Sequence, residues 1–447
     1  MRDLVLLAIV GALLPYCLFR PWIGVLVFTW LSMMNPHRLT YGFAYSWPWA
    51  FAVALVTVIG VVFSRDRRRM PWNAPLVLMV LCTIYFTMMT FFALAPEEYA
   101  WSAWERFVKI VLMTMIIPLV IYGQKRITWL VAVAALSIGF FGFKGGIFTL
   151  THGGVFSVRG PAGSFIEDNN ALGLALVMVV PLLHWLASQE SRIVLKRIYS
   201  VTMWLSMLSS AFTYSRGALL GLASVTSLLF FKSQRKILVL LVAVPLIFFG
   251  MEFVPEQLYE RAESIDNYQQ DASAQLRLQA WGVAWNVAVE RPLTGGGFAF
   301  EYVPDARWLS YAPFRVPNAA NYARAAHSIY FQILGEQGFV GLALFLAMLF
   351  ATLRSLRKTK LAAGKCGAPW IASLASSLQI SLIAYMVSGA FLSLAYFDLP
   401  YLVIVLTAVL QREVAQYALQ LEKRIRTANS VRPIPSSLPA RSIQHSR

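Results

Sequence analysis

Residues 169–188 read NNALGLALVMVVPLLHWLAS, a stretch without lysine, arginine or carboxylate. A helix of about 20 such residues spans the hydrocarbon core of a bilayer. Apolar residues make up 58% of the chain and charged residues 13%, against about 45–50% and about 25% in soluble domains. The sequence therefore predicts an all-α polytopic membrane protein. Its thirteen apolar stretches are 4–19, 21–34, 47–63, 74–95, 106–122, 127–150, 169–188, 197–213, 215–231, 237–251, 328–353, 369–395 and 399–411.

The formal net charge of +17 is concentrated in short basic clusters between these stretches. Lysine and arginine are retained in cytoplasmic loops during membrane insertion. Placing every cluster inside gives one consistent orientation, so topology explains the charge and we expect no nucleic acid as a partner. The clusters lie at 65–69, 125–126, 192–197, 232–236 and 354–360, and in the tail.

The first two stretches decide the number of crossings. Pro15, Arg20 and Pro21 interrupt 4–19 and 21–34, so we expect a bent pair with one net crossing. The chain then has about twelve transmembrane helices and both termini inside. The alternative is thirteen crossings with the N-terminus outside. The segment lacks a small-residue cleavage site, so we expect it to be retained.

This orientation divides the chain into four parts. An N-terminal bundle, 1–251, precedes an external loop domain, 252–327, between the tenth and eleventh apolar stretches. C-terminal transmembrane helices, 328–411, are followed by a basic cytoplasmic tail, 412–447, expected to be disordered from about residue 427.

The external loop has a predicted helix over 273–290. Leu278, Trp281, Trp285 and Ala288 fall at i, i+3, i+7 and i+10, an apolar stripe, and Pro292 with the glycines at 295–297 ends the helix. We expect this helix to lie at the membrane interface or to cap the bundle.

The residues suited to chemistry are cationic and external. The chain has no P-loop, no dinucleotide fingerprint and no zinc-protease or serine-hydrolase motif, and the three cysteines have no metal spacing. We therefore predict no metal and no cofactor. Arg216 follows Tyr214 and Ser215 at the external start of an apolar helix, where it adds to the positive helix end and suits an anion.

Other external arginines extend this pattern. Arg277 precedes the tryptophan stripe, and Arg159 lies in the second sizeable external loop. Further positive charge comes from Arg307, Arg315 and Arg324.

His327 opens the apolar stretch that follows the external loop. Neighbouring arginines lower the pKa of an imidazole and keep it neutral, able to accept a proton. Arginines bind phosphate oxygens bidentately. Together these residues predict a lipid-linked diphosphate substrate whose headgroup is transferred to a hydroxyl, with the arginines stabilising the leaving group and His327 acting as the base.

Three motifs between about 160 and 350 resemble the O-antigen ligase and polymerase superfamily. They are YSRGA at 214–218; RLQAW at 277–281, which leads into RPLTGGGF at 291–298; and HSIYFQILGEQG at 327–338. At the N-terminus, RPWIG at 20–24 and MNPHRLTYG at 34–42 are similar to a subgroup of exosortase-associated O-glycosylation ligases.

The resemblance implies a metal-independent, inverting glycosyltransferase of a bacterial inner membrane, with its site facing the periplasm. It implies an undecaprenyl-diphosphate-linked glycan as the donor and lipid A-core oligosaccharide as the acceptor. It implies that Arg216 and Arg277 hold the diphosphate and that His327 activates the acceptor hydroxyl. Asparagine often follows this histidine in the family, whereas this chain has Ser328. From charge and position we add Arg159, Arg307, Arg315, Arg324 and Ser215 as substrate-binding residues.

Three further functions use similar residues or a similar location. An O-antigen polymerase and a protein O-glycosylation ligase share the donor chemistry and differ in the acceptor. A transporter of lipid-linked glycans needs polar groups near the bilayer midplane, whereas the charged residues here lie mostly at the ends of the apolar stretches.

Overall fold

The computed structural model describes residues 1–232, 272–317 and 319–430, and this part of the chain is helical. The N-terminal region contains α1 (Arg2–Phe19), α2 (Pro21–Met34), α3 (Trp49–Phe63), α4 (Ala74–Thr90), α5 (Glu97–Val120), α6 (Gly123–Thr151), α7 (Asn169–Gln189), α8 (Ile193–Ala211) and α9 (Arg216–Lys232). The rest contains α12 (Ala272–Glu290), α13 (Asp305–Ser310), α14 (Ile329–Lys365), α15 (Pro369–Ser388) and α16 (Asp398–Ser430). Short 3₁₀ turns are η1 (Pro36–Leu39), η2 (Phe43–Tyr45), η3 (Phe300–Tyr302) and η4 (Gly389–Phe391).

Each predicted apolar stretch within the described residues contains a helix, and only 237–251 lies outside them. Three helices continue past their predicted ends. α5 begins at Glu97, before the predicted stretch 106–122, α14 continues to Lys365, and α16 continues to Ser430, past the start of the expected disorder at about residue 427. Residues 354–365, which we placed in a connection between apolar stretches, and residues 427–430, where we expected disorder, are therefore helical. Leu, Ala, Lys, Arg and Glu all favour helix, so a helix need not end where the bilayer does.

Among the described residues, six helices are long and apolar enough to cross a membrane. They are Arg2–Phe19, Gly123–Thr151, Asn169–Gln189, Ile329–Lys365, Pro369–Phe391 and Asp398–Arg424, and α2, α3 and α4 are shorter apolar helices. The chain is thus a multi-pass helical membrane protein, and the count of twelve crossings stays a prediction.

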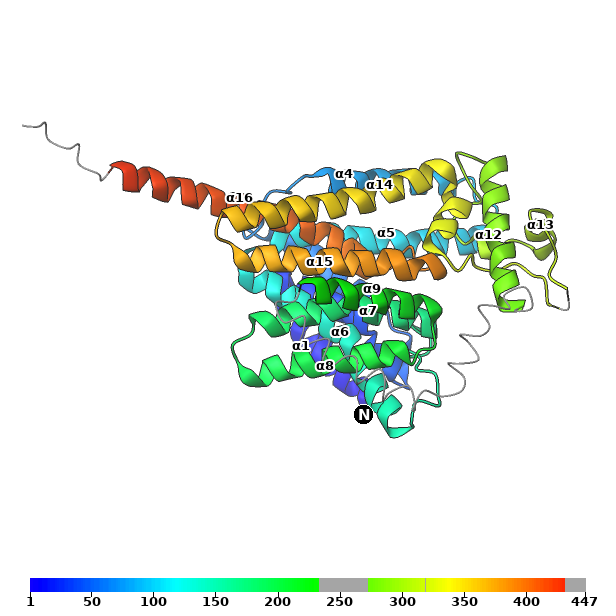
Figure 1. Cartoon of the computed structure of the whole chain (residues 1–447), viewed down its shortest axis with the longest axis horizontal. Coiled ribbons are helices and arrows are strands. Elements are labelled where there is room, and N and C mark those ends of the chain that lie inside the picture. Colours follow the sequence, from blue (N-terminus) through cyan, green and yellow to red (C-terminus); the bar gives the residue numbers. More distant parts are fainter. Residues whose placement is uncertain (233–271, 318, 431–447) are drawn as a thin grey trace, which may run out of the picture.

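The long helices lie side by side, and α12 crosses one end of the bundle (Figure 1). The centre is α7, which packs against α6, α8, α9 and α15. Its side chains from Leu172 to Leu183 are buried almost completely. This explains why the stretch is apolar all round rather than on one face.

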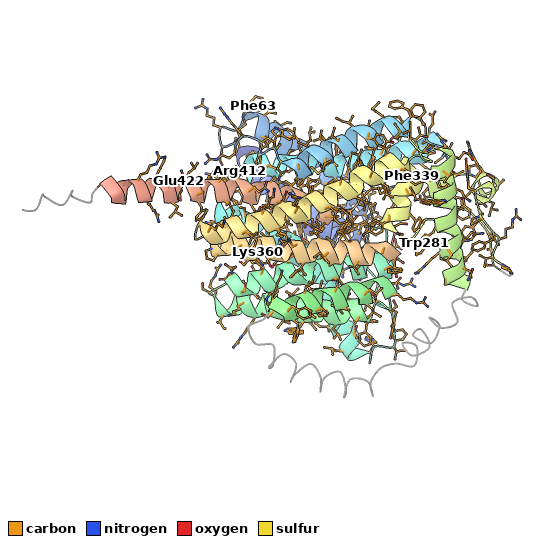
Figure 2. All side chains as sticks on the ribbon, turned by 45° about the horizontal axis from the view of Figure 1, so that its top comes forward. Phe63, Trp281, Phe339, Lys360, Arg412 and Glu422 are labelled. Carbon is orange, nitrogen blue, oxygen red and sulfur yellow. The ribbon has the colours of Figure 1, made fainter. Side chains whose placement is uncertain are left out.

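The predicted cytoplasmic loops gather at the other end. Arg126 forms an ion pair of 2.7 Å with Asp66, and Arg412 donates hydrogen bonds to the carbonyls of Pro118 (2.6 Å) and Ile121 (2.7 Å). Figure 2 shows Lys360 and Trp281 at opposite ends of the bundle. Arg126, Lys360 and Arg412 therefore lie at one end of the bundle and α12 lies at the other, which is consistent with the predicted orientation.

The helix predicted over 273–290 is present as α12, but its predicted apolar stripe is wrong in part. Leu278 and Trp285 are 39% and 51% exposed, whereas the buried face consists of Gln279, Ala280, Val283, Ala284, Val287 and Ala288. The small residues allow close contact with α14, because a Cβ on Gly335 would lie only 3.0 Å from that of Ala284.

Candidate active site

Arg216 is the first residue of α9, and the preceding turn fixes its position. Tyr214 has a left-handed backbone (φ 55°), and the Ser215 hydroxyl caps the helix by accepting from the Ala218 N–H at 3.2 Å. An N-cap serine satisfies a helix N–H that has no partner within the helix. Arg216 is consequently held at the positive end of a helix, as predicted. Ser215 itself is buried, with its hydroxyl in the cap.

The same turn is tied to the start of α7. The Asn169 amide donates to the Thr213 carbonyl at 2.7 Å, and the Val158 N–H donates to the Phe212 carbonyl at 3.1 Å. Asp168 caps α7, accepting from the N–H groups of Asn170 (2.9 Å) and Ala171 (3.3 Å). The starts of α7 and α9 therefore lie together.

His327 is held by α12. The Trp281 indole N–H donates to the Ala326 carbonyl at 2.7 Å, and its ring stacks on Phe331 with centroids 4.9 Å apart. His327 follows Ala326 in a left-handed conformation (φ 49°), two residues before α14 begins. Arg277 lies one turn before Trp281 on α12, so the bond to Ala326 brings it close to the histidine.

The residues that shift the pKa of His327 identify its charged neighbours. Burial is the main cause that lowers the pKa of His327 from 6.5, and the positive charges of Arg277 and Arg324 lower it further. The negative charge of Asp168 acts in the opposite direction. The imidazole is thus neutral at pH 7 and can accept a proton. The sequence predicted that neighbouring arginines lower the pKa of His327, whereas burial lowers this pKa more than the arginines do.

The turn η4 joins the Arg216 side of this region to the His327 side. A Cβ on Gly217 would lie 3.0 Å from the Ser388 carbonyl oxygen and 3.2 Å from the Cβ of Phe391. A Cβ on Gly389 would lie 2.7 Å from the Cδ1 of Ile329, the first residue of α14. The starts of α7, α9 and α14 therefore converge at one end of the bundle, beside α12. Helix N-termini attract anions because their N–H groups are unsatisfied.

The remaining predicted residues lie at different places. Arg324 lies near His327, stacks on the ring of Tyr322 and donates to the Ala320 carbonyl at 2.6 Å. Arg159 is exposed in the loop that bonds to the Arg216 turn. Arg315 is exposed, and Arg307 lies on α13, where its charge acts on Arg291 and Tyr311. No contact joins Arg307 or Arg315 to His327 within the described ranges, and their substrate-binding role stays a prediction.

Asp168 was missing from the predicted site. The sequence contains a signal for it, because an aspartate followed by two asparagines before an apolar stretch is typical of a helix N-cap. Its closeness to His327 depends on the segments that precede α7 and α14 lying near each other, which local sequence does not reveal. Across the described helices and loops, no group of three or more His, Cys, Asp or Glu side chains gathers as a metal site. Metal independence remains a prediction.

Comparison with known families gives two matches that together cover most of the chain. Residues 1–191 match a family of unknown function, and residues 201–346 match the family described as O-antigen ligase. No curated protein matches the chain. The second match contains Arg216, Arg277 and His327, and it supports glycosyl transfer of the ligase or polymerase type. Residues 201–346 of the chain are thus similar to the O-antigen ligase family.

Proposed function

We propose that this protein is an O-antigen ligase. It moves a glycan from undecaprenyl diphosphate to a hydroxyl of lipid A-core oligosaccharide, at the periplasmic face of the bacterial inner membrane. The main support is the gathering of the Arg216 turn, Asp168, Arg277 and His327 at the end of the bundle away from the basic loops. This orientation fits twelve crossings, with the loop 252–327 as the periplasmic domain.

The reaction proceeds by one displacement. The acceptor oxygen attacks the anomeric carbon from the face opposite the diphosphate, and His327 takes the proton of the hydroxyl. The bond between the anomeric carbon and the diphosphate oxygen breaks, and undecaprenyl diphosphate leaves with the electron pair. Attack from the opposite face inverts the anomeric configuration.

Arg216 and Arg277 stabilise the negative charge that develops on the leaving diphosphate. Fixed donors of this kind typically contribute about 10²–10³-fold to a rate. The N-terminus of α9 adds positive partial charge at the same place. The diphosphate is a ready leaving group, so the reaction requires neither metal nor nucleotide.

The decisive experiment combines purified protein, undecaprenyl-diphosphate-linked glycan and rough lipopolysaccharide. Wild type should produce glycan on the lipid A-core, also in excess chelator, and His327→Ala should produce none. Loss of activity in chelator with rescue by added metal would overturn the metal-free mechanism. If the core stays unmodified while the donor is intact, the ligase proposal fails. Longer donor-linked glycan would then indicate a polymerase, and a glycosylated protein would indicate a protein O-glycosylation ligase.

A further inference from the structure

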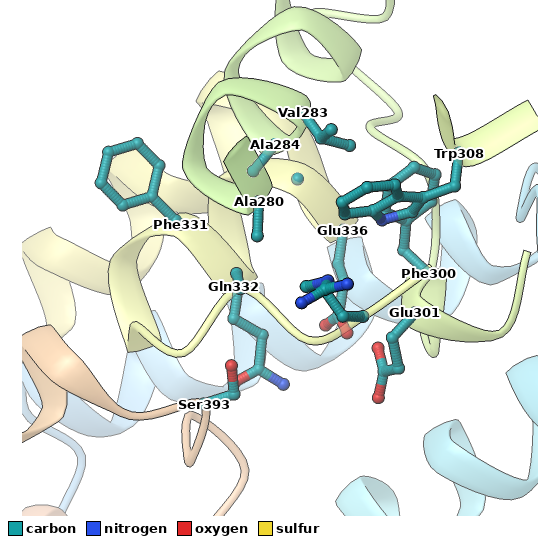
Figure 3. A pocket seen from close by; sticks show the side chains of 13 residues that line it. Ala280, Val283, Ala284, Phe300, Glu301, Trp308, Phe331, Gln332, Glu336 and Ser393 are labelled. Atoms are coloured by element: carbon teal, nitrogen blue, oxygen red, sulfur yellow. The ribbon is translucent and has the colours of Figure 1, made fainter. Parts of the chain in front are cut away.

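Two hollows in the bundle differ greatly in size. The one beneath α12 has room for about 20 Å³, the space of one water molecule, and Gln332 and Glu336 already bond to each other there. Figure 3 shows both side chains in this space, below Ala280. The other hollow is a groove lined by α1, α2, α6 and α8, with room for about 630 Å³. This volume is within the roughly 300–1,000 Å³ typical of ligand sites.

One face of α6 forms the floor of the groove. Trp129, Ala132, Leu136 and Phe140 line it at i, i+3, i+7 and i+11, a spacing that places them on the same side of the helix. Trp129 and Phe140 remain 51% and 39% exposed. From Trp129 to Phe140 this face is about 17 Å long, at about 1.5 Å per residue. One leaflet of a hydrocarbon core of about 30 Å is about 15 Å thick, so the groove has the length of one leaflet.

The walls of the groove are apolar, and its charged groups lie at one end. α6 packs against both α2 and α8, and Leu26, Trp30 and Leu195 of these two helices line the groove. The charged residues of the lining are Glu190 and Arg192, which form an ion pair of 3.2 Å with each other. They lie in the connection between α7 and α8, on the predicted cytoplasmic side. The groove is therefore amphipathic along its length.

Lys125 adds a positive charge to the same end. It precedes Trp129 by one turn of α6, so it lies on the face that forms the floor, and it is exposed. Within the described residues, no hydrogen bond or ion pair engages its ammonium group. The next lining residue, Thr128, offers a hydroxyl. A lysine near a membrane interface extends its ammonium group to the headgroups. An ammonium group and a hydroxyl beside an apolar groove suit a phosphate that carries a hydrocarbon chain.

The position of this polar end indicates which lipid fits. The donor of the proposed reaction has its diphosphate at Arg216, at the opposite end of the bundle, so its headgroup does not match the groove. A phospholipid of the cytoplasmic leaflet has its phosphate at the basic end and its chains directed toward the middle of the bundle. Basic residues at this surface attract anionic lipids, by about 1 kcal/mol for each lysine or arginine. Arg126 and Lys360 also lie at this end.

We propose that the groove binds one anionic phospholipid of the cytoplasmic leaflet, with an acyl chain along the Trp129–Phe140 face of α6 and the phosphate at Lys125 and Thr128. The chain would cover apolar surface between α2 and α8 that the described part of the bundle leaves exposed. Binding should therefore stabilise the folded protein.

Binding can be measured without glycan transfer, so the result does not depend on the proposed function. The probe is dioleoyl phosphatidylglycerol, titrated into delipidated full-length protein in detergent, with native mass spectrometry and thermal melting as the two readouts. Wild type should bind one lipid and melt at a higher temperature. Lys125→Gln should weaken binding about fivefold, through the loss of one lysine at the lipid surface. Lys358→Gln is the matched control, because Lys358 is exposed on α14 outside the groove, and it should bind as wild type does.

A second pair of variants tests the apolar floor. Ala132→Phe fills the groove and should weaken binding at least about tenfold, whereas Val77→Phe, at an exposed position on α4, should not. Lys125→Gln keeps the proposal testable even where Ala132→Phe does not fold, since Lys125 is exposed.

Four outcomes would overturn the proposal. The first is a wild-type protein that binds no phospholipid and keeps its melting temperature. The second is wild-type affinity in both Lys125→Gln and Ala132→Phe. The third is equal binding of dioleoylglycerol, which has the same chains and no phosphate. The fourth is a change of oligomeric state in Ala132→Phe, which would assign the groove to a second copy of the chain.

Discussion

At the scale of single residues, His327 lies between charges of opposite sign. Burial, Arg277 and Arg324 disfavour its protonated form, and Asp168 favours it. Its pKa therefore lies below 6.5, and the neutral base predominates at neutral pH. Arg277 lies on α12 and Asp168 lies at the start of α7. The pKa of His327, at the start of α14, therefore depends on how these three helices are arranged.

The pH dependence of transfer tests this balance. The rate should fall as the pH decreases through the pKa of His327, because the protonated imidazole cannot accept a proton. Arg277→Gln removes a positive charge, so the acidic limb should move to higher pH. Asp168→Asn removes a negative charge, so the limb should move to lower pH. The measurement is kcat/KM against pH for each variant.

Lys196→Gln is the control for these two variants, because Lys196 is exposed at the basic end of the bundle. Its acidic limb should coincide with that of wild type. If Arg277→Gln and Asp168→Asn moved the limb in the same direction, the arrangement of charges around His327 would be wrong.

Arg216 should not tolerate replacement by lysine. Arg216→Lys keeps the charge but loses the planar fork that binds two phosphate oxygens. We expect the transfer rate to decrease by about tenfold or more, in line with the loss of a charged hydrogen bond. Arg192→Lys is the matched control, since the Arg192 side chain is 75% exposed at the other end of the bundle. Wild-type turnover by Arg216→Lys would rule out the bidentate role.

At the scale of elements, the glycine-rich segment after α12 forms hydrogen bonds with backbone groups of α14 next to an interruption in that helix. Gly338 interrupts that helix with φ 66° and ψ −171°. The N–H groups of Gly296 and Gly297 donate to the carbonyls of Gly335 (2.7 Å) and Glu336 (2.8 Å), and the Phe339 N–H donates to the Pro292 carbonyl at 2.9 Å. A broken helix in a membrane protein is tolerated where other groups satisfy its backbone.

Gly338→Ala should therefore destabilise the protein. The new Cβ would lie 2.5 Å from the Pro292 carbonyl oxygen in a backbone conformation that side chains rarely adopt. We expect a loss on the order of 1–3 kcal/mol in the free energy of unfolding, seen as a lower melting temperature in detergent. Gly364→Ala in the same helix meets no atom within 4 Å and should stabilise by up to about 1 kcal/mol. Equal melting temperatures for the two variants would contradict this account.

The bond between α12 and the His327 segment gives a second prediction at this scale. Trp281→Phe keeps an aromatic ring against Phe331 but loses the N–H that binds the Ala326 carbonyl. We expect kcat to decrease several-fold, because His327 is less well positioned, while the melting temperature changes little. Trp285→Phe, at an exposed position on the same helix, should leave kcat unchanged. A melting temperature that falls in step with activity would assign Trp281 a purely structural role.

Sequence patterns predicted the elements better than their contacts. The length and pattern of an apolar stretch are enough to locate an apolar helix, and α2 was predicted with its observed bounds. The stripe on α12 was wrong at Leu278 and Trp285, because periodicity does not say which face meets a partner, and small residues let α14 approach on the Ala280 side. Similarly, Arg216 and His327 were found from charge and position, whereas the place of Asp168 depends on contacts between segments distant in the sequence.

At the scale of the whole molecule, the polarity of the bundle determines which compartment the site faces. The basic loops lie at one end, with Arg126 paired to Asp66 and Arg412 bound to the end of α5. α12 lies at the other end (Figure 1), where its Trp281 donates a hydrogen bond to the residue before His327. Since lysine and arginine are retained inside, the site is expected outside, where lipid-linked glycans are presented to a ligase.

The native cysteines allow this orientation to be tested in cells. Cys17 and Cys82 are buried, whereas Cys366 is partly exposed in the connection between α14 and α15, at the basic end. A membrane-impermeant maleimide should therefore leave wild type unlabelled in intact spheroplasts and should label Cys366 after permeabilisation. Glu290→Cys in a Cys366→Ser background should behave in the opposite way, with labelling in intact spheroplasts. If Cys366 reacted before permeabilisation and Glu290→Cys only afterwards, the site would face the cytoplasm and a periplasmic ligase would be excluded.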